Sequence, residues 1–211
     1  MSDRQAGGDP KATASSTARE LDAQAHALRN QLNTVTMAAG LVSDEELGRE
    51  LRLVAGDLVR SIDRLVVGAR IELGRAPAIV ELPIDELFGL AERRARRERG
   101  GEPTGVVVAG AAVTTSVRVP GIWAERLLTD LLHALAAAGA SLQLELAEEQ
   151  PTGEAVLVRL GCSFDALDEQ TRRTAAAVGA TLTQAADESC ELTLPLELDR
   201  SAREQAGDRL A

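Results

Sequence analysis

Apolar residues in the first third of the chain recur at alternating spacings of four and three. Between residues 21 and 42 the positions are Leu21, Ala25, Leu28, Leu32, Val35, Ala39 and Val42. This is the a/d pattern of a coiled-coil heptad. It predicts a first helix from about Ser16 to Val42, with an apolar seam that packs against another helix.

A second helix is predicted to follow after a very short turn. Ser43-Asp44-Glu45-Glu46 matches a capping box, in which Ser43 binds the backbone N–H of Glu46 and Glu46 reaches back. Gly74 and Pro77 end the helix at about Leu73. Its apolar positions have the same spacing and are Leu47, Leu51, Val54, Leu58, Leu65 and Ala69.

The two helices together predict an antiparallel hairpin about 40 Å long, at about 1.5 Å per residue. A hairpin of two helices cannot bury a continuous apolar seam alone. Pairing with a second copy in a four-helix bundle buries it, which predicts a homodimer. The alternative is that the rest of the same chain covers the seam.

The pattern changes after Pro77 to helices alternating with pairs of strands. Helices are expected at 83–98, 123–138 and 167–178. Strands are expected at 106–108, 113–119, 142–146, 156–160, 180–183 and 192–198. Short connections between neighbouring strands favour a mostly antiparallel sheet with helices on one face. The fold class is therefore α+β: a two-helix hairpin forming a dimeric four-helix bundle, followed by an α/β sandwich.

Four segments follow from these patterns. Residues 1–15 are a polar, disordered arm, and 16–76 form the helical hairpin. Residues 79–198 form the α/β domain, and 199–211 are a polar tail.

Composition excludes several classes of partner. The net charge of −10 argues against nonspecific nucleic-acid binding, which needs a cationic surface. No window approaches 18 uninterrupted apolar residues, so we expect no membrane span, and the polar N-terminus is unlike a secretory signal. Cys162 and Cys190 lack metal-ligand spacing, and a reduced pair in the cytoplasm is expected over a disulfide.

The candidate chemistry lies on the first helix. His26, Asn30, Asn33 and Met37 are spaced i, i+4, i+7 and i+11, so they share one flank of that helix, beside the seam. A histidine held there is rigid yet open to a partner, as an imidazole that receives and gives up a phosphoryl group must be. The alternative is a solvated surface histidine.

The segment His26-Ala27-Leu28-Arg29-Asn30-Gln31-Leu32 resembles the phosphoacceptor box of histidine kinases, usually His-Glu-x-Arg-(Asn/Thr)-Pro-Leu. Four positions match, and Ala27 and Gln31 do not. A hairpin followed by an α/β domain also resembles the kinase core, over about residues 16–198. In that family the hairpin dimerises and carries phosphate, and the second domain is a GHKL-type ATP-binding domain.

The second domain departs from the residues that bind ATP in the family. His133 stands where the family has its magnesium-binding asparagine, and 161–165 read Gly-Cys-Ser-Phe-Asp in place of Asp-x-Gly-x-Gly. The glycine-rich lid is also absent, which leaves few backbone N–H groups to hold phosphates. Ala27 replaces the acidic residue that orients the histidine toward ATP. These departures imply a degenerate domain without ATP or another cofactor.

The combination resembles the dimeric histidine phosphotransferases of the ChpT type, and also a sporulation phosphotransferase of the same architecture. The resemblance implies that His26 accepts phosphate from receiver domains of a hybrid histidine kinase and of response regulators, which supply the magnesium. Arg29 and Asn30 are candidates to contact the phosphoryl group, and Asn33 and Met37 to contact the partner.

Two other functions stay open. The chain is alternatively a non-catalytic pseudo-kinase module that binds a response regulator or a kinase, with Arg29 and Asn30 as ordinary surface residues. An active ATP-dependent kinase with unusual motifs is the third hypothesis, and nucleotide binding would support it.

Three further features have structural interpretations. His133 is expected to be a satisfied core or surface histidine, and Trp123 a packing anchor. The basic end of the helix at 83–98 is either a solvated helix terminus or a surface for an acidic receiver; its residues are Arg93, Arg94, Arg96, Arg97 and Arg99.

Overall fold

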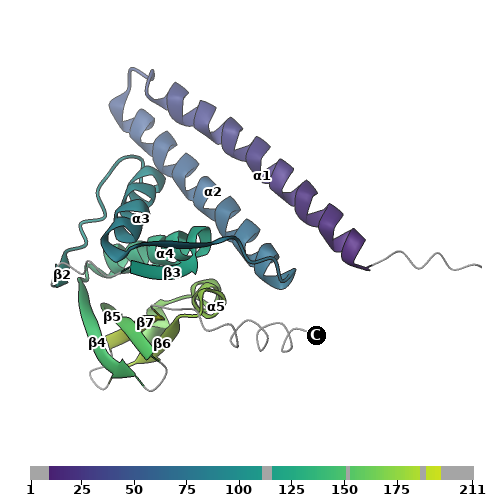
Figure 1. The fold of residues 1–211 in the computed structure, drawn as a ribbon. Helices are drawn as coiled ribbons and strands as arrows, with labels where there is room; N and C mark the ends of the chain where they lie inside the picture. Colours follow the sequence, from purple (N-terminus) through teal and green to yellow (C-terminus); the bar gives the residue numbers. More distant parts are fainter. Residues whose placement is uncertain (1–9, 111–115, 151–152, 186–188, 196–211) are drawn as a thin grey trace, which may run out of the picture.

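A computed structural model describes residues 10–110, 116–150, 153–185 and 189–195. Helices α1 (Pro10–Ala39) and α2 (Glu45–Glu72) form a long antiparallel hairpin. An α/β domain follows on the side of α2 that faces away from α1 (Figure 1). The α+β class with an N-terminal hairpin is therefore confirmed.

The first helix differs at both ends from the prediction. It begins at Pro10 rather than near Ser16, because proline suits the first turn of a helix and alanine-rich sequence follows it. It ends at Ala39 rather than Val42, where Gly40 N–H bonds the carbonyl of Met37. Residues 1–9 of the predicted arm lie outside the described residues.

The N-cap of α2 is Asp44, and the prediction that Ser43 caps the helix is wrong. Asp44 Oδ1 accepts the backbone N–H groups of Glu46, at 3.0 Å, and Leu47, at 3.1 Å. A carboxylate satisfies these donors as a hydroxyl does, and its charge also interacts favourably with the helix dipole.

In its described residues the α/β domain contains two sheets and three further α-helices. Its elements are β1 (Ile79–Pro83), α3 (Ile84–Glu98), β2 (Val108–Gly110), β3 (Ser116–Pro120), α4 (Gly121–Ala138), β4 (Leu142–Gln150), β5 (Gly153–Ser163), η1 (Phe164–Ala166), α5 (Glu169–Val178), β6 (Thr181–Gln184) and β7 (Ser189–Pro195). The larger sheet has the order β2-β4-β5-β7-β6, and only its β2–β4 pair is parallel. The mostly antiparallel sheet is thus confirmed.

Strand β1 was not predicted. It is five residues long, runs directly into α3, and pairs with the distant β3 in a separate two-stranded sheet. The pattern of apolar residues within five positions is too short to predict a strand, and the strand that pairs with β1 lies more than 30 residues further along the chain. Val113 and Thr115 of one predicted strand, Leu196 and Leu198 of another, and the tail at 199–211 lie outside the described residues.

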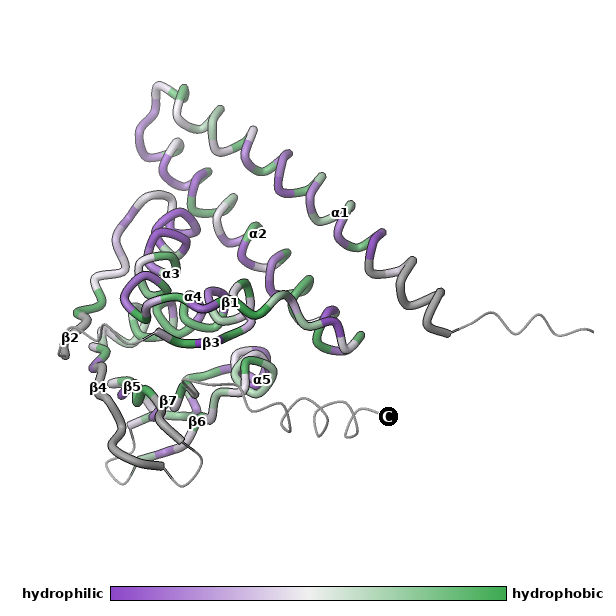
Figure 2. Tube along the Cα trace, viewed as in Figure 1, coloured by the Kyte–Doolittle hydropathy of each residue, from purple (hydrophilic) through white to green (hydrophobic). Residues whose placement is uncertain are grey.

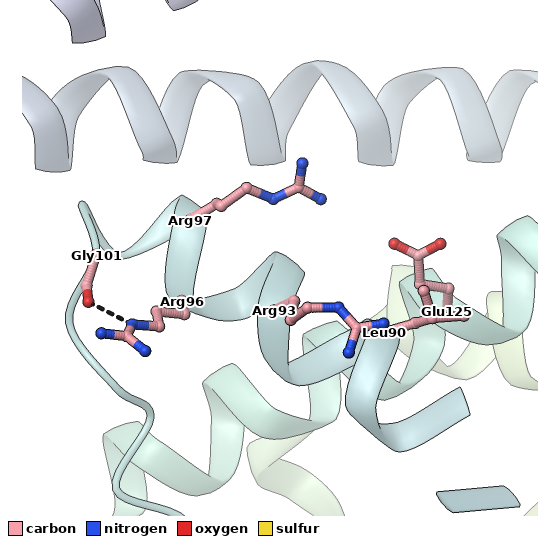
Figure 3. Close-up of a pocket in the computed structure, with 6 residues that line it drawn as sticks. All are labelled: Leu90, Arg93, Arg96, Arg97, Gly101 and Glu125. Carbon is pink, nitrogen blue, oxygen red and sulfur yellow. Dashed lines mark hydrogen bonds between the residues drawn. The ribbon is translucent and has the colours of Figure 1, made fainter. Parts of the chain in front are cut away.

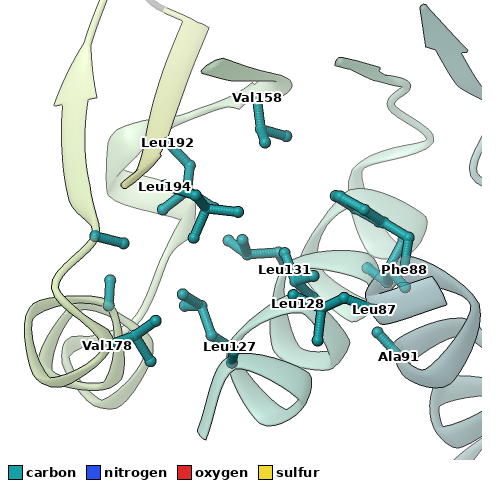
Figure 4. Close-up of a cluster of buried hydrophobic side chains, with 14 of the residues drawn as sticks. Leu87, Phe88, Ala91, Leu127, Leu128, Leu131, Val158, Val178, Leu192 and Leu194 are labelled. Carbon is teal, nitrogen blue, oxygen red and sulfur yellow. The ribbon is translucent and has the colours of Figure 1, made fainter. Parts of the chain in front are cut away.

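The core of the domain lies between α4 and the larger sheet, with α3 and α5 flanking α4 (Figure 4). Leu127 and Leu131 of α4 face Val158 and Leu192 of the sheet, and all four are fully buried. Trp123 is also buried in this cluster, which confirms it as a packing anchor.

Apolar and polar residues are mixed along both hairpin helices (Figure 2). Within the part of the chain that the structure describes, no helix combines the length and apolar character needed to cross a membrane.

Helix α2 crosses the C-terminal end of α3 at very short range. A Cβ built on Gly56 of α2 would lie 1.9 Å from the carbonyl oxygen of Glu98 at the end of α3. That neighbour is backbone, so it cannot move aside as a flexible side chain would. Gly56 therefore sets how closely the hairpin approaches the second domain.

We expect Gly56→Ala to lower the free energy of unfolding by about 1–3 kcal/mol, because overpacking must separate α2 from α3. Gly89→Ala in α3 is the matched control. Its added methyl meets only a flexible Arg93 nitrogen at 3.4 Å, so it should gain up to about 1 kcal/mol from helix propensity. Urea unfolding of both variants checks this, and equal behaviour would contradict the close approach.

Candidate functional site

His26 is exposed on α1, directly after the buried seam residue Ala25. The side-chain amide of Asn30, one turn along the helix, lies 3.2 Å from His26 Nε2. In the neutral ring that carries its proton on Nδ1, Nε2 accepts a hydrogen bond from this amide. In that tautomer Nε2 carries the lone pair that can attack an electrophile.

Asn33 and Met37 continue the same flank toward the hairpin turn. Both are exposed, and the Met37 side chain is exposed to 76%. The flank therefore carries one nucleophile, two amides and one exposed apolar side chain. That composition suits transient contact with another protein.

Arg29 is turned toward α2 rather than standing free on the surface. Its Nε donates to Asp63 Oδ1 at 2.5 Å, and its side chain is 34% exposed. Among the described residues, its two terminal guanidinium nitrogens have no partner. They are free to donate to an anion, while the Nε contact fixes the rest of the side chain.

Asp63 on α2 was missed in the sequence. It is 4% exposed, and its second oxygen accepts from Arg94 Nη2 of α3. The only signal is that the apolar spacing of the second helix becomes irregular around Ser61 and Ile62. An acidic residue on a buried helix face requires cationic partners, but sequence does not say which arginines supply them.

Asp63 belongs to a larger group of ion pairs where the hairpin meets the second domain, which we call the junction cluster. Arg126 of α4 is fully buried and donates to Glu98 and Asp130, while His133 Nε2 lies 3.0 Å from Glu98. The members are Arg60, Asp63, Arg64, Arg94, Glu98, Glu125, Arg126, Asp130, His133 and Asp168.

Two acidic members of the cluster, Glu98 and Asp168, are held in their charged forms. Burial by itself would raise the pKa of Glu98, but hydrogen bonds from His133 and Arg126 and the nearby arginine charges lower it to about 2. Burial likewise opposes ionisation of Asp168, yet the bond from Arg64 and those from Thr171 lower its pKa to about 2. Asp168 is also the N-cap of α5.

Asp130 and His133 of α4 are both engaged in this cluster. Asp130 forms ion pairs with Arg126, Arg60 and Arg64. His133 is buried against Glu98, as expected of a satisfied histidine. The connection from β5 to α5 contains only η1 and two further residues. Among the described residues, no three His, Cys, Asp or Glu side chains are grouped to hold a metal ion.

A cleft of about 450 Å³ lies beside the C-terminal half of α3 (Figure 3). Arg93, Arg96 and Arg97 line it, together with Leu90, Gly101 and Glu125. Arg96 donates to the Gly101 carbonyl at 2.8 Å, whereas Arg93 and Arg97 have no partner among the described residues. The basic end of α3 is thus divided: Arg94 is buried in the cluster, and these arginines form a cationic hollow in an acidic protein.

The structure is similar to the cytoplasmic segment of the histidine kinase QseC, with a TM-score of 0.45 and 15% sequence identity. The alignment covers 66% of this chain and 95% of that one. No family model and no curated protein matches the sequence. The likeness concerns the course of the chain.

The junction cluster predicts an acid-sensitive fold. The low pKa of Glu98 means that its contribution to stability is complete above its ordinary value near 4.5 and is lost as pH falls toward 2. Glu98→Gln removes one of the two carboxylates that the buried Arg126 pairs with, Asp130 being the other, and should cost about 3–5 kcal/mol at pH 7. The variant should also lose less stability than the wild type between pH 5 and pH 2.

Urea unfolding at a series of pH values checks this. The control is Glu191→Gln, which removes the exposed pair with Arg159 and should change stability by less than about 1 kcal/mol. Parallel pH profiles for the wild type and Glu98→Gln would show that Glu98 does not stabilise the junction.

Proposed function

We propose that this protein is a histidine phosphotransferase of a two-component phosphorelay, of the ChpT type, acting as a cytoplasmic homodimer. The observation that carries the proposal is the exposed His26 imidazole. It stands on a rigid helix with Nε2 beside the Asn30 amide and with the free guanidinium nitrogens of Arg29 three residues away. Residues three apart are neighbours on a helix surface, so the proposed nucleophile and the proposed anion donor occupy adjacent positions of α1.

In the proposed reaction, His26 Nε2 attacks the phosphorus of a receiver's aspartyl phosphate. The N–P bond forms as the P–O bond to the aspartate breaks, and the aspartate leaves as a carboxylate with the bonding electron pair. The ring keeps its Nδ1 proton. A second receiver's carboxylate then attacks the phosphohistidine and reverses these steps. Asn30 must release Nε2 before attack, so its bond sets the tautomer in the resting state.

Transfer from a receiver, rather than from ATP, fits the rest of the chain. His133, at the position of the family's magnesium-binding asparagine, is buried against Glu98, and the nearby Asp130 is buried in ion pairs with arginines. The short β5–α5 connection leaves no room for a lid, and Ala27 offers no base beside His26. An aspartyl phosphate is already an activated donor, and a receiver brings its own magnesium.

Dimerisation is supported by the apolar surface of the hairpin. Eight of the eleven exposed large hydrophobic side chains among the described residues lie on it: Leu28, Val35, Met37, Leu41, Leu47, Val54, Leu58 and Leu65. On α1, the exposed Leu28 and Val35 lie three or four positions from Ala25, Leu32 and Ala39, which are buried or partly buried. The α2 members continue the heptad. A second hairpin is the occupant that this repeat fits, because each helix of a four-helix bundle needs two apolar faces.

The receiver is proposed to dock on the His26 flank, where Asn33 and Met37 supply polar and apolar contacts. The cationic cleft of α3 is a second contact for an acidic receiver surface, since Arg93 and Arg97 are unpartnered and project from the second domain. Apolar contact supplies affinity at such an interface, and charge supplies selection.

The first test is transfer of labelled phosphate. Candidate receiver domains charged on their aspartate are mixed with the protein and magnesium, and acid-labile, base-stable phosphate is sought on this chain. We expect label on the wild type and none on His26→Ala. The chain has only two histidines, and His133 is buried, so mass spectrometry assigns the position.

Two controls separate the alternatives. Incubation with labelled ATP and magnesium alone should give no label, and label there would indicate a kinase. Receiver binding without any transfer, by wild type and His26→Ala alike, would make the protein an interaction module and His26 a surface residue.

The dimer is tested by placing charge in the exposed stripe. Leu58→Glu and Leu65→Glu should convert the dimer to a monomer, because burying unpaired carboxylates between two hairpins costs several kcal/mol (about 2–7 for a polar group). Ile122→Glu is the control, as Ile122 is similarly exposed but lies on α4. Sedimentation velocity gives the mass of each. A wild type that is monomeric at tens of micromolar would disprove the dimer.

A further inference from the structure

Asp63 is a carboxylate of α2 that joins the His26 helix to the second domain. Its two oxygens serve different elements: Oδ1 accepts from Arg29 of α1 at 2.5 Å, and Oδ2 accepts from Arg94 of α3. With 4% exposure it is shielded from water, so both contacts are stronger than surface ion pairs. Removing its charge would weaken the contact with Arg29 and the contact with Arg94 at once.

The Arg29 end of this arrangement is unsaturated. Asp63 takes only Nε, which leaves both terminal nitrogens of Arg29 without a partner among the described residues. Two parallel N–H groups on a fixed guanidinium match two oxygens of a phosphoryl group. Arg29 lies three residues after His26, on an adjacent position of the helix surface.

The Arg94 end is saturated. Its Nε donates to Glu98 and its Nη1 to Glu125 of α4, each at 3.2 Å, in addition to the Asp63 contact. The pKa of Arg94 is raised, because the charges of Asp63 and Glu125 outweigh the cost of burial. Arg94 is thus fixed within the second domain and holds Asp63 in one orientation.

We propose that Asp63 is a positioning residue, which orients Arg29 toward the phosphoryl group on His26 and makes that orientation depend on docking of the second domain through Arg94. This inference rests on the proposed phosphotransfer function. The second domain then has a role in the reaction without binding nucleotide: it fixes the anion donor of the hairpin.

The test compares Asp63→Asn, Arg94→Gln and Arg29→Gln in phosphoryl transfer from a charged receiver. Asp63→Asn and Arg29→Gln should each lower the rate constant at saturating receiver about ten- to a hundredfold, with the half-saturating receiver concentration unchanged. Arg94→Gln should lower it less, because Asp63 stays but loses its anchor. The double variant Arg29→Gln/Asp63→Asn should be no slower than Arg29→Gln, since Asp63 acts through Arg29.

The matched control is Arg70→Gln, which removes another pair between α1 and α2, with Asp22 at 2.7 Å. It should transfer phosphate at the wild-type rate. The Arg29 Nε–H signal in NMR is the second readout: it should shift in Asp63→Asn and in Arg94→Gln but not in Arg70→Gln. This readout separates a change at Arg29 from a general loss of folding.

The outcomes are distinct. A wild type that takes no phosphate removes the proposed function, and the inference with it. A wild type that is labelled while Asp63→Asn transfers equally fast overturns only the inference. A further loss when Asp63→Asn is added to Arg29→Gln would show that Asp63 acts on stability rather than through Arg29. If Asp63→Asn does not fold, an unshifted Arg29 signal and an unchanged rate in Arg94→Gln overturn it.

Discussion

Buried charge at one crossing of helices governs this structure. Asp63, Glu98 and Asp130 are withdrawn from water, and each is stable there only because arginines reach it from a neighbouring helix. The arginines come from both parts of the chain. The hairpin and the α/β domain therefore have a defined relative placement, and Gly56 permits the close backbone approach that these pairs require.

The two helices of the hairpin have different neighbours in this arrangement. Helix α2 gives one face to α1 and another to the second domain, and its remaining apolar stripe faces outward. Helix α1 contacts mainly α2, which leaves the flank of His26 open. A rigid, exposed imidazole is thus a consequence of α2 being occupied by the second domain while α1 is not.

The second domain has a helix-on-sheet core, and the polar side chains of α4 belong to the junction cluster that joins it to the hairpin. On α4, Asp130 Oδ1 accepts from Arg126 and Arg60, and His133 Nε2 contacts Glu98. A charged ligand that bound at Asp130 and His133 would have to displace the side chains that contact them. The displaced charges would then be buried without partners. The apolar face of α4 is unaffected, since it packs on the sheet.

The sequence alone determined the hairpin, the mostly antiparallel sheet and the position of His26 beside the seam. Each depends on spacings within one element, such as Leu21 to Val42, or on a flank such as His26 to Met37. Local periodicity is enough to predict such features. It also predicted Trp123 as an anchor and His133 as a satisfied histidine.

Only the tertiary structure shows which groups surround His26. The pairing of Arg29 with Asp63, and of Asp63 with Arg94, joins residues 34 and 31 positions apart, and β1 finds its partner in β3 across all of α3. The cap at Asp44 rather than Ser43 was a choice between adjacent, chemically similar residues. Contacts between distant elements depend on how helices cross, and no spacing within a single helix encodes that crossing.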